Sequence, residues 1–148
     1  MHHSQAVDMT DLLRTRGRSK ELQALGKRIS ISQTDEIKYM KQWLEERNQS
    51  TTMDMGGMEH KGHSMLMPGM LTPEQMKALA RASGARFDHL FLTGMIQHHN
   101  GALVMVQDLF DTPGAGQDPV LFDFATDIDN TQRAEIEIMR RMLSKEKR

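Results

Sequence analysis

The chain has 148 residues, with 14 methionines, 7 histidines, no cysteine and a formal net charge of −1. This length is typical of one domain with a substantial core, and the balanced charges exclude an extended basic surface for nucleic acid. The absence of cysteine excludes disulfide bonds and thiolate metal sites, and no apolar run is long enough to span a membrane.

The first predicted elements are a helix over residues 2–15 and a long helix over residues 19–47. Apolar residues recur in both at the three- and four-residue spacing of a buried helical face. Ser19 is a suitable N-cap for the long helix, whose inward face has a polar middle. The expected inward-facing residues are Ala6, Met9, Leu13, Leu22, Leu25, Ile29, Ser32 or Gln33, Glu36, Met40 and Trp43 or Leu44.

Periodicity is lost between residues 48 and 71, where several glycines predict a flexible connector. Linkers rarely accumulate methionine, because exposed thioethers gain no stability and oxidise readily. We therefore interpret the connector as a loop that binds soft metal ions, the alternative being an apolar loop that lies on the bundle. Its candidate ligands are Met53, Met55, Met58, His60, His63, Met65, Met67 and Met70.

Three further helices are predicted, over residues 72–82, 85–110 and 118–145. The short helix begins with a capping box, in which Thr72 is the N-cap, Pro73 the first helical residue and Gln75 the reciprocal partner. The last helix begins in a similar way with Asp118 and Pro119. No segment shows the apolar alternation of a strand.

The chain carries a His-His motif twice. Residues 2–9 overlay residues 98–105, and residues 29–40 overlay residues 128–139. This correspondence indicates an internal duplication of a helical hairpin, which makes chance placement of two His-His pairs improbable. The aligned pairs are His2 with His98, His3 with His99, Met9 with Met105, Gln33 with Gln132, and Glu36 with Glu135.

Four main helices in two similar hairpins predict an all-α fold, an antiparallel four-helix bundle. Residues 1–148 then form one domain. Its expected parts are a first hairpin over residues 1–47, a Met/His-rich linker over 48–71, and a second hairpin over 72–148 with a short leading helix. The second motif has a helical lead-in that the first lacks, so we expect the first hairpin to be truncated at its start and an export signal to be missing.

The second His-His motif lies on an apolar helical face. Met95, His98, Ala102 and Met105 share one side of a helix. A single histidine on such a face is commonly a satisfied core residue, but the second copy and the nearby thioethers make a metal site an equal alternative. Neutral imidazole and thioether select Cu(I) or Ag(I), whereas zinc prefers cysteine, histidine and carboxylate.

We expect His2 and His98 to approach each other across the bundle. His3 and His99 lie about a quarter turn off this face, toward solvent or a neighbouring helix. The alternative is a polar layer whose members only satisfy one another and set helix register. The groups expected to orient the imidazole rings are Gln33, Glu36, Gln132 and Glu135.

The sequence lacks the motifs of the enzyme classes that a helical protein of this size would suggest. A di-iron bundle needs Glu-x-x-His pairs, which both hairpins lack. Cysteine nucleophiles, a glycine-rich phosphate loop and a serine elbow are also absent from the sequence. We therefore expect no enzymatic activity, with copper oxidation as the weakest alternative.

The blocks Met-x-x-His-His-x-x-Ala-x-x-Met and Gln-x-x-Glu-Ile-x-x-Met resemble those of domain-of-unknown-function family 305. The likeness covers nearly the whole chain, although the first copy lacks the upstream half of its motif. It implies a ferritin-like helical bundle in an exported bacterial protein with a role in metal tolerance, as in the CopM-like copper-binding proteins. The motif positions it implies are His2, His3, Met9, Met95, His98, His99 and Met105.

We therefore expect an extracytoplasmic protein, periplasmic, secreted or lipid-anchored, that buffers or carries copper. Cu(I) is the favoured ion, with Cu(II) and Ag(I) as the other candidates. Other copper-handling proteins are candidate partners, and self-association would cover exposed apolar surface. The alternative is a structural or interaction module in which the His-His layer sets packing or oligomerisation.

Overall fold

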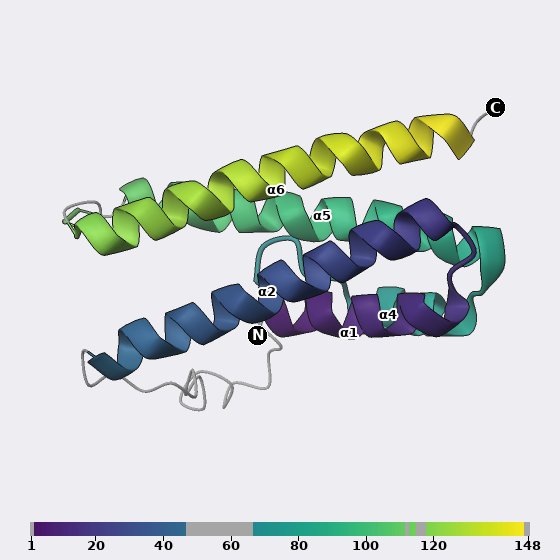
Figure 1. Ribbon diagram of the computed structural model, residues 1–148, viewed down its shortest axis with the longest axis horizontal. Helices are drawn as coiled ribbons and strands as arrows, with labels where there is room; N and C mark the ends of the chain where they lie inside the picture. The colour runs from purple at the N-terminus through teal and green to yellow at the C-terminus, as the bar shows by residue number, and fades with distance from the viewer. Residues whose placement is uncertain (1, 47–66, 112, 115–117, 147–148) are drawn as a thin grey trace.

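The computed structural model describes residues 2–46, 67–111, 113–114 and 118–146, which form five α-helices (Figure 1). The all-α prediction is confirmed, and each predicted helix end lies within one residue of the observed end. The described residues contain no β-strand, apart from an isolated bridge between Gly17 and Gly84. The helices are α1 (His2–Arg16), α2 (Lys20–Glu46), α4 (Pro73–Arg81), α5 (Gly84–Asp111) and α6 (Pro119–Glu146).

At the start of three of these helices an N-cap side chain accepts backbone amide hydrogen bonds, as the sequence predicts. In α4 the Thr72 hydroxyl accepts the Gln75 amide at 3.1 Å, and the Thr72 amide donates to Gln75 Oε1 at 2.8 Å. Ser19 Oγ accepts a first-turn amide of α2, and Asp118 Oδ1 accepts two first-turn amides of α6. These bonds satisfy backbone donors that have no partner inside a helix.

A buried carboxylate ties the turn of the first hairpin to α5. Asp88 on α5 accepts the backbone amide of Arg18 at 2.9 Å and that of Ser19 at 2.8 Å. A negative charge is favourable here, because these amides lie at the positive end of α2. The contact joins the two hairpins at one end of the molecule.

The main core lies beside the N-terminal half of α5, where α1 packs against α2 and α5, and α4 packs against α5. Figure 1 shows α1 and α4 alongside this half of α5. The other half carries a smaller cluster of Val106, Ala125 and Ile128 between α5 and α6. The fully buried residues of the main core include Met9, Leu13, Leu22, Leu25, Ile29, Leu79, Phe87, Phe91, Met95 and Met139.

The segment Met67–Leu71, here called the crossing segment, passes over the middle of α5 before α4 begins. Its backbone touches that of α5, because Gly69 and Gly101 both lack a side chain at the contact. A Cβ on Gly101 would overlap the Pro68 carbonyl, and one on Gly69 would overlap the Gln97 carbonyl. Gly69 also has φ of +78°, which favours glycine.

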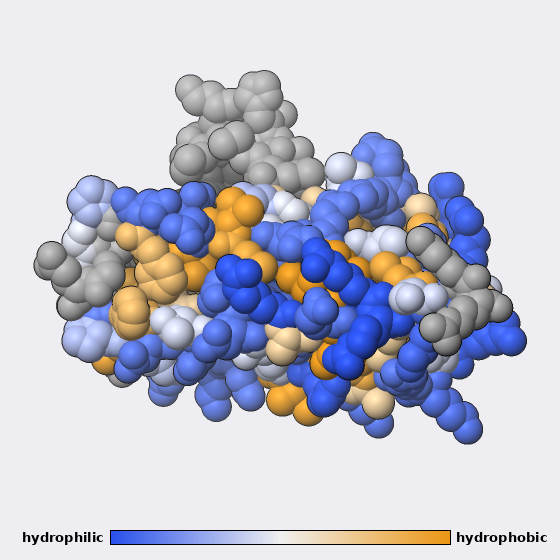
Figure 2. All heavy atoms as spheres, turned by 90° about the horizontal axis from the view of Figure 1, so that it is seen from above, coloured by the Kyte–Doolittle hydropathy of each residue, from blue (hydrophilic) through white to orange (hydrophobic). Residues whose placement is uncertain are grey.

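Figure 2 shows a largely hydrophilic surface on which hydrophobic side chains gather in patches. Among the described residues, no helix combines the length and the apolar composition that crossing a membrane requires. The large apolar residues with the most exposed surface are Ile31, Tyr39, Val104, Val120 and Phe122.

Candidate metal centre

The two His-His motifs meet in the middle of the molecule. His2 lies in the first turn of α1 and His98 in the middle of α5, and both are buried. Their rings stack with centroids 3.6 Å apart and planes 25° apart. The predicted approach of His2 and His98 is therefore confirmed.

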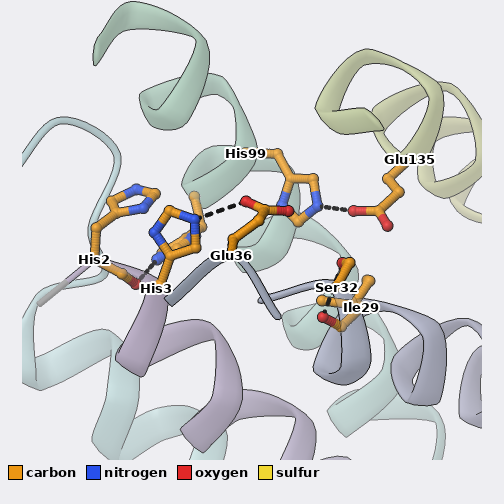
Figure 3. A network of polar contacts seen from close by, with 8 residues as sticks. His2, His3, Ile29, Ser32, Glu36, His99 and Glu135 are labelled. Carbon is orange, nitrogen blue, oxygen red and sulfur yellow. Dashed lines mark hydrogen bonds and ion pairs between the residues drawn. The ribbon is translucent and has the colours of Figure 1, made fainter. Parts of the chain in front are cut away.

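The second histidine of each motif bonds to the other helix of its own hairpin (Figure 3). His3 Nε2 lies 2.8 Å from Glu36 Oε1 on α2, and His99 Nε2 lies 2.6 Å from Glu135 Oε1 on α6. Successive helical residues point about 100° apart, so one histidine faces the partner hairpin while the next faces its own. Of the two directions expected for His3 and His99, the neighbouring helix is the one observed, and both are buried.

The hydrogen bonds fix which ring nitrogen carries the proton. His98 Nε2 lies 2.6 Å from the backbone oxygen of His2, and since a carbonyl only accepts, this nitrogen is the donor. Ionised carboxylates also only accept, so His3 and His99 donate through Nε2 as well. In the neutral His98 ring the lone pair is therefore left on Nδ1.

The four motif histidines, together with Gln33, Glu36, Gln132 and Glu135, form what we call the His-His layer. Several of its buried polar atoms have no hydrogen-bond partner among the described residues. An unpaired buried polar group costs about 1–3 kcal/mol, so a layer that served only to satisfy itself would not leave so many. Most of these atoms fit a site for a cation, because imidazole nitrogens and amide oxygens with a free lone pair are electron donors, whereas the amide nitrogen of Gln132 only donates hydrogen bonds. The atoms are Nδ1 and Nε2 of His2, Nδ1 of His98, Nδ1 of His99, Oε1 of Gln33, and Oε1 and Nε2 of Gln132.

Burial keeps the stacked imidazoles neutral. It lowers the pKa of His2 to about 4, and repulsion from His3 is the next cause. It lowers the pKa of His98 to about 3, followed by repulsion from His2. Both rings therefore keep their lone pairs at neutral and mildly acidic pH, which is the form that binds metal ions.

Three methionines line a cavity of about 340 Å³ beside the layer. His2 and His3 form part of its wall, together with Met40 from α2, Met67 from the crossing segment and Met105 from α5. The rest of the wall is apolar, so imidazole and thioether are its main potential ligands. Met40 was not among the predicted ligands. The signal for it was present, because Met40 aligns with Met139 in the repeat and follows Glu36 by one helical turn.

A second cavity of about 440 Å³ lies between α2 and α6 and has acidic walls. Its carboxylates include Asp35, Asp123 and Glu36, the last of which bonds to His3. Tyr39 and Phe124 line both cavities and stack at 4.5 Å between ring centroids. The approach to the layer from this side is therefore favourable for cations.

The structure separates the predicted sulfur ligands into different groups. Met9 and Met95 are fully buried in the main core, whereas Met105 and Met67 line the cavity. Met70 is half-buried on the crossing segment. No group of three or more histidine, aspartate or glutamate side chains is arranged to hold a metal within the described ranges. The remaining predicted ligands lie outside the described residues, namely Met53, Met55, Met58, His60, His63 and Met65.

Solved structures resemble nearly the whole chain. A protein described as a secreted DUF305 protein from Streptomyces coelicolor superposes with a TM-score of 0.82 at 28% identity, over 97% of this chain and 86% of that one. A DUF305 fragment from Deinococcus radiodurans gives a TM-score of 0.80 at 26% identity, covering 97% and 89%. CopM in its Cu(I)-bound form gives a TM-score of 0.74 at 28% identity, with the same coverage.

CopM is also similar to this chain in its Cu(II)-bound and silver-bound forms, with TM-scores of 0.75 and 0.68. No curated protein matches the sequence. The sequence profile described as "Domain of unknown function (DUF305)" matches residues 1–143. The resemblance inferred from the duplicated motifs is confirmed, and the chain belongs to the DUF305 family.

Proposed function

We propose that this protein binds Cu(I) or Ag(I) outside the cytoplasm and buffers or carries the ion without catalysing a reaction. The observation that carries the proposal is the group of unpartnered imidazole nitrogens beside a methionine-lined cavity. Neutral imidazole and thioether are soft ligands, which favour these ions over zinc, magnesium and calcium. Cu(II) is a further candidate ion, for which imidazole alone is suitable.

The chain's own residues have separable roles in this proposal. His2 and His98 offer nitrogen ligands, and Met40, Met67 and Met105 offer sulfur ligands. Glu36 and Glu135 hold the rings of His3 and His99 by their Nε2 atoms, so Nδ1 is the nitrogen proposed to bind an ion. Carboxylates bonded to ligating histidines commonly fix ring orientation and raise ligand basicity in this way.

The relatives support the metal and the compartment. CopM has been solved with Cu(I), Cu(II) and silver bound, and the Streptomyces relative is described as secreted. We extend both properties to this chain, with copper tolerance as the proposed role. The Met/His-rich sequence between residues 53 and 65 is proposed to capture the ion, and the four longer helices to form a ferritin-like bundle with α4 attached to α5.

The test is a competition titration of metal-free protein with Cu(I) against a chromophoric chelator. We expect His98→Leu, and Met40→Leu combined with Met105→Leu, each to weaken binding by at least about tenfold, because each removes proposed ligands. The matched controls are His89→Leu, an exposed histidine bonded to Glu146, and Met142→Leu, which packs against the main core. Both controls should bind as the wild type does.

The same titration distinguishes capture of the ion by residues 53–65 from binding at the site that depends on His98. Leucine at Met53, Met55, Met58 and Met65 should reduce the number of ions bound while leaving the His98-dependent site intact. Binding that is unchanged in all of these variants would overturn the proposal. If His98→Leu instead alters only the melting temperature or the oligomeric state, the layer is a structural module.

A further inference from the structure

The crossing segment is held by a two-bond clamp from α1. Gln5 Nε2 donates to the Leu71 backbone oxygen at 3.0 Å, and the Leu71 amide donates to Gln5 Oε1 at 2.7 Å. One amide side chain therefore satisfies both polar groups of one backbone residue. Gln5 follows His2 by three residues, so the clamp lies within one helical turn of the stacked histidines.

A second amide side chain holds the same segment from α5. Gln97 Nε2 lies 3.3 Å from the Gly69 oxygen and 3.2 Å from the Met70 oxygen, and donates to both. Gln97 Oε1 in turn accepts from Gln75 Nε2 at 3.0 Å. Gln97 immediately precedes His98, so both clamps start from the helical turns that carry the histidine pair.

The two copies of the motif have diverged at the position that contacts this segment. Gln5 in the first copy aligns with Gly101 in the second. Gln5 bonds to the backbone of the crossing segment, whereas Gly101 has no side chain and lets that backbone touch α5. The contact places Met67 in the wall of the cavity with His2 and Met105.

We propose that Gln5, Gln97 and Gly101 are positioning residues that fix Met67 as a thioether ligand of the copper site. The inference rests on the function proposed above. The clamps act on the backbone two to four residues after Met67, so they limit where its sulfur can reach. Without them, the backbone of the crossing segment would no longer be fixed beside the layer, and Met67 would contribute less to binding.

The test is a double-mutant cycle with Gln5→Glu and Met67→Leu. Glu keeps the acceptor for the Leu71 amide but replaces the donor with a second acceptor, so it breaks the bond to the Leu71 oxygen and the two oxygens repel each other. We expect each single variant to weaken Cu(I) binding by about tenfold, and Gln5→Glu to have little further effect once Met67 is leucine. Gln107→Leu is the matched control, because Gln107 is exposed on α5 and bonds only to Asp111 among the described contacts.

Two further measurements separate positioning from a general structural role. X-ray absorption of the Cu(I) protein should show fewer sulfur ligands in Gln5→Glu. In the metal-free protein, the labelled methyl resonance of Met67 should shift in this variant, while that of Met139 in the main core should not.

Additive losses in the cycle, or an unchanged sulfur count and Met67 resonance, would overturn the inference while leaving copper binding in place. A wild-type protein that does not bind Cu(I) would overturn the proposed function itself. In that case an unchanged Met67 resonance would also show that Gln5 does not position the segment.

Discussion

Burying His98 costs stability that an apolar side chain of similar size would not cost. Its Nε2 is satisfied by the His2 backbone oxygen, but its Nδ1 has no partner among the described residues. The penalty for an unpaired buried nitrogen is about 1–3 kcal/mol. A ligand that takes the lone pair removes the penalty, so the free energy lost in the metal-free fold is regained on binding.

The lowered histidine pKa values predict that the metal-free protein loses stability as pH falls. His2 faces the rings of His98, His3 and His99, and the folded state keeps it and His98 neutral to about pH 4 and about pH 3. In the unfolded chain both rings take up a proton near pH 6.5, the ordinary pKa of histidine. Above pH 6.5 the two rings therefore have no effect on stability. Below pH 6.5 each ring lowers the free energy of unfolding progressively, by up to about 1.4 kcal/mol per pH unit.

Urea unfolding between pH 7 and about pH 4.5 measures this slope. The free energy of unfolding should fall less steeply with decreasing pH in His98→Leu than in the wild type, because one of the two rings no longer titrates. Met142→Leu, which removes no titratable group, is the control and should keep the wild-type slope. Equal slopes in all three proteins would contradict the predicted protonation states.

Glu135 is predicted to matter more for metal binding than for folding. Glu135→Gln keeps an acceptor for His99 Nε2 but replaces a charge-assisted bond with a neutral one, which costs about 1 kcal/mol of folding free energy. Copper affinity should fall by about tenfold, because a carboxylate partner raises the basicity of Nδ1. Glu137→Gln on the exposed face of α6 should change neither quantity. Equal copper affinities in the two variants would argue against a role for the His99 pair.

At the scale of the helices, the repeat explains why two hairpins can share one polar layer. Each hairpin supplies a stacked histidine and a His–Glu pair between its own helices. The copies differ at the position that contacts the crossing segment, where the second has Gly101 against its backbone and the first has the bonded amide of Gln5. The two hairpins are thus alike in the His-His layer and differ beside it at one aligned position, Gln5 on α1 and Gly101 on α5.

Gly101→Ala is predicted to destabilise the protein, although alanine normally stabilises a helix by about 1 kcal/mol relative to glycine. The added Cβ would overlap the Pro68 carbonyl, so α5 and the crossing segment would have to separate. The expected loss is about 1–3 kcal/mol, measured by urea unfolding. Asn100→Ala, at the neighbouring exposed position, should be neutral or slightly stabilising. A stabilised Gly101→Ala would show that the two backbones are not in close contact.

At the scale of the whole molecule, local signals predicted more than long-range ones. Helix ends followed from Ser19, Thr72 and Asp118, because capping is decided within a few residues. The meeting of His2 and His98 followed from the repeat. The distribution of methionines did not, because Met9 and Met105 align in the repeat yet lie in the main core and in the cavity respectively. That difference depends on α1 beginning beside the middle of α5, which helical periodicity cannot show.

Two groups among the described methionines differ in their exposure to oxidants. Met9, Met95 and Met139 are fully buried, whereas Met40, Met67 and Met105 are half-buried around the cavity. Peroxide would convert the second group to sulfoxides first, and a sulfoxide oxygen is a harder donor than a thioether. The protein would then lose the preference for soft ions that we propose while its core stayed packed, and methionine sulfoxide reductase could restore binding without refolding the chain.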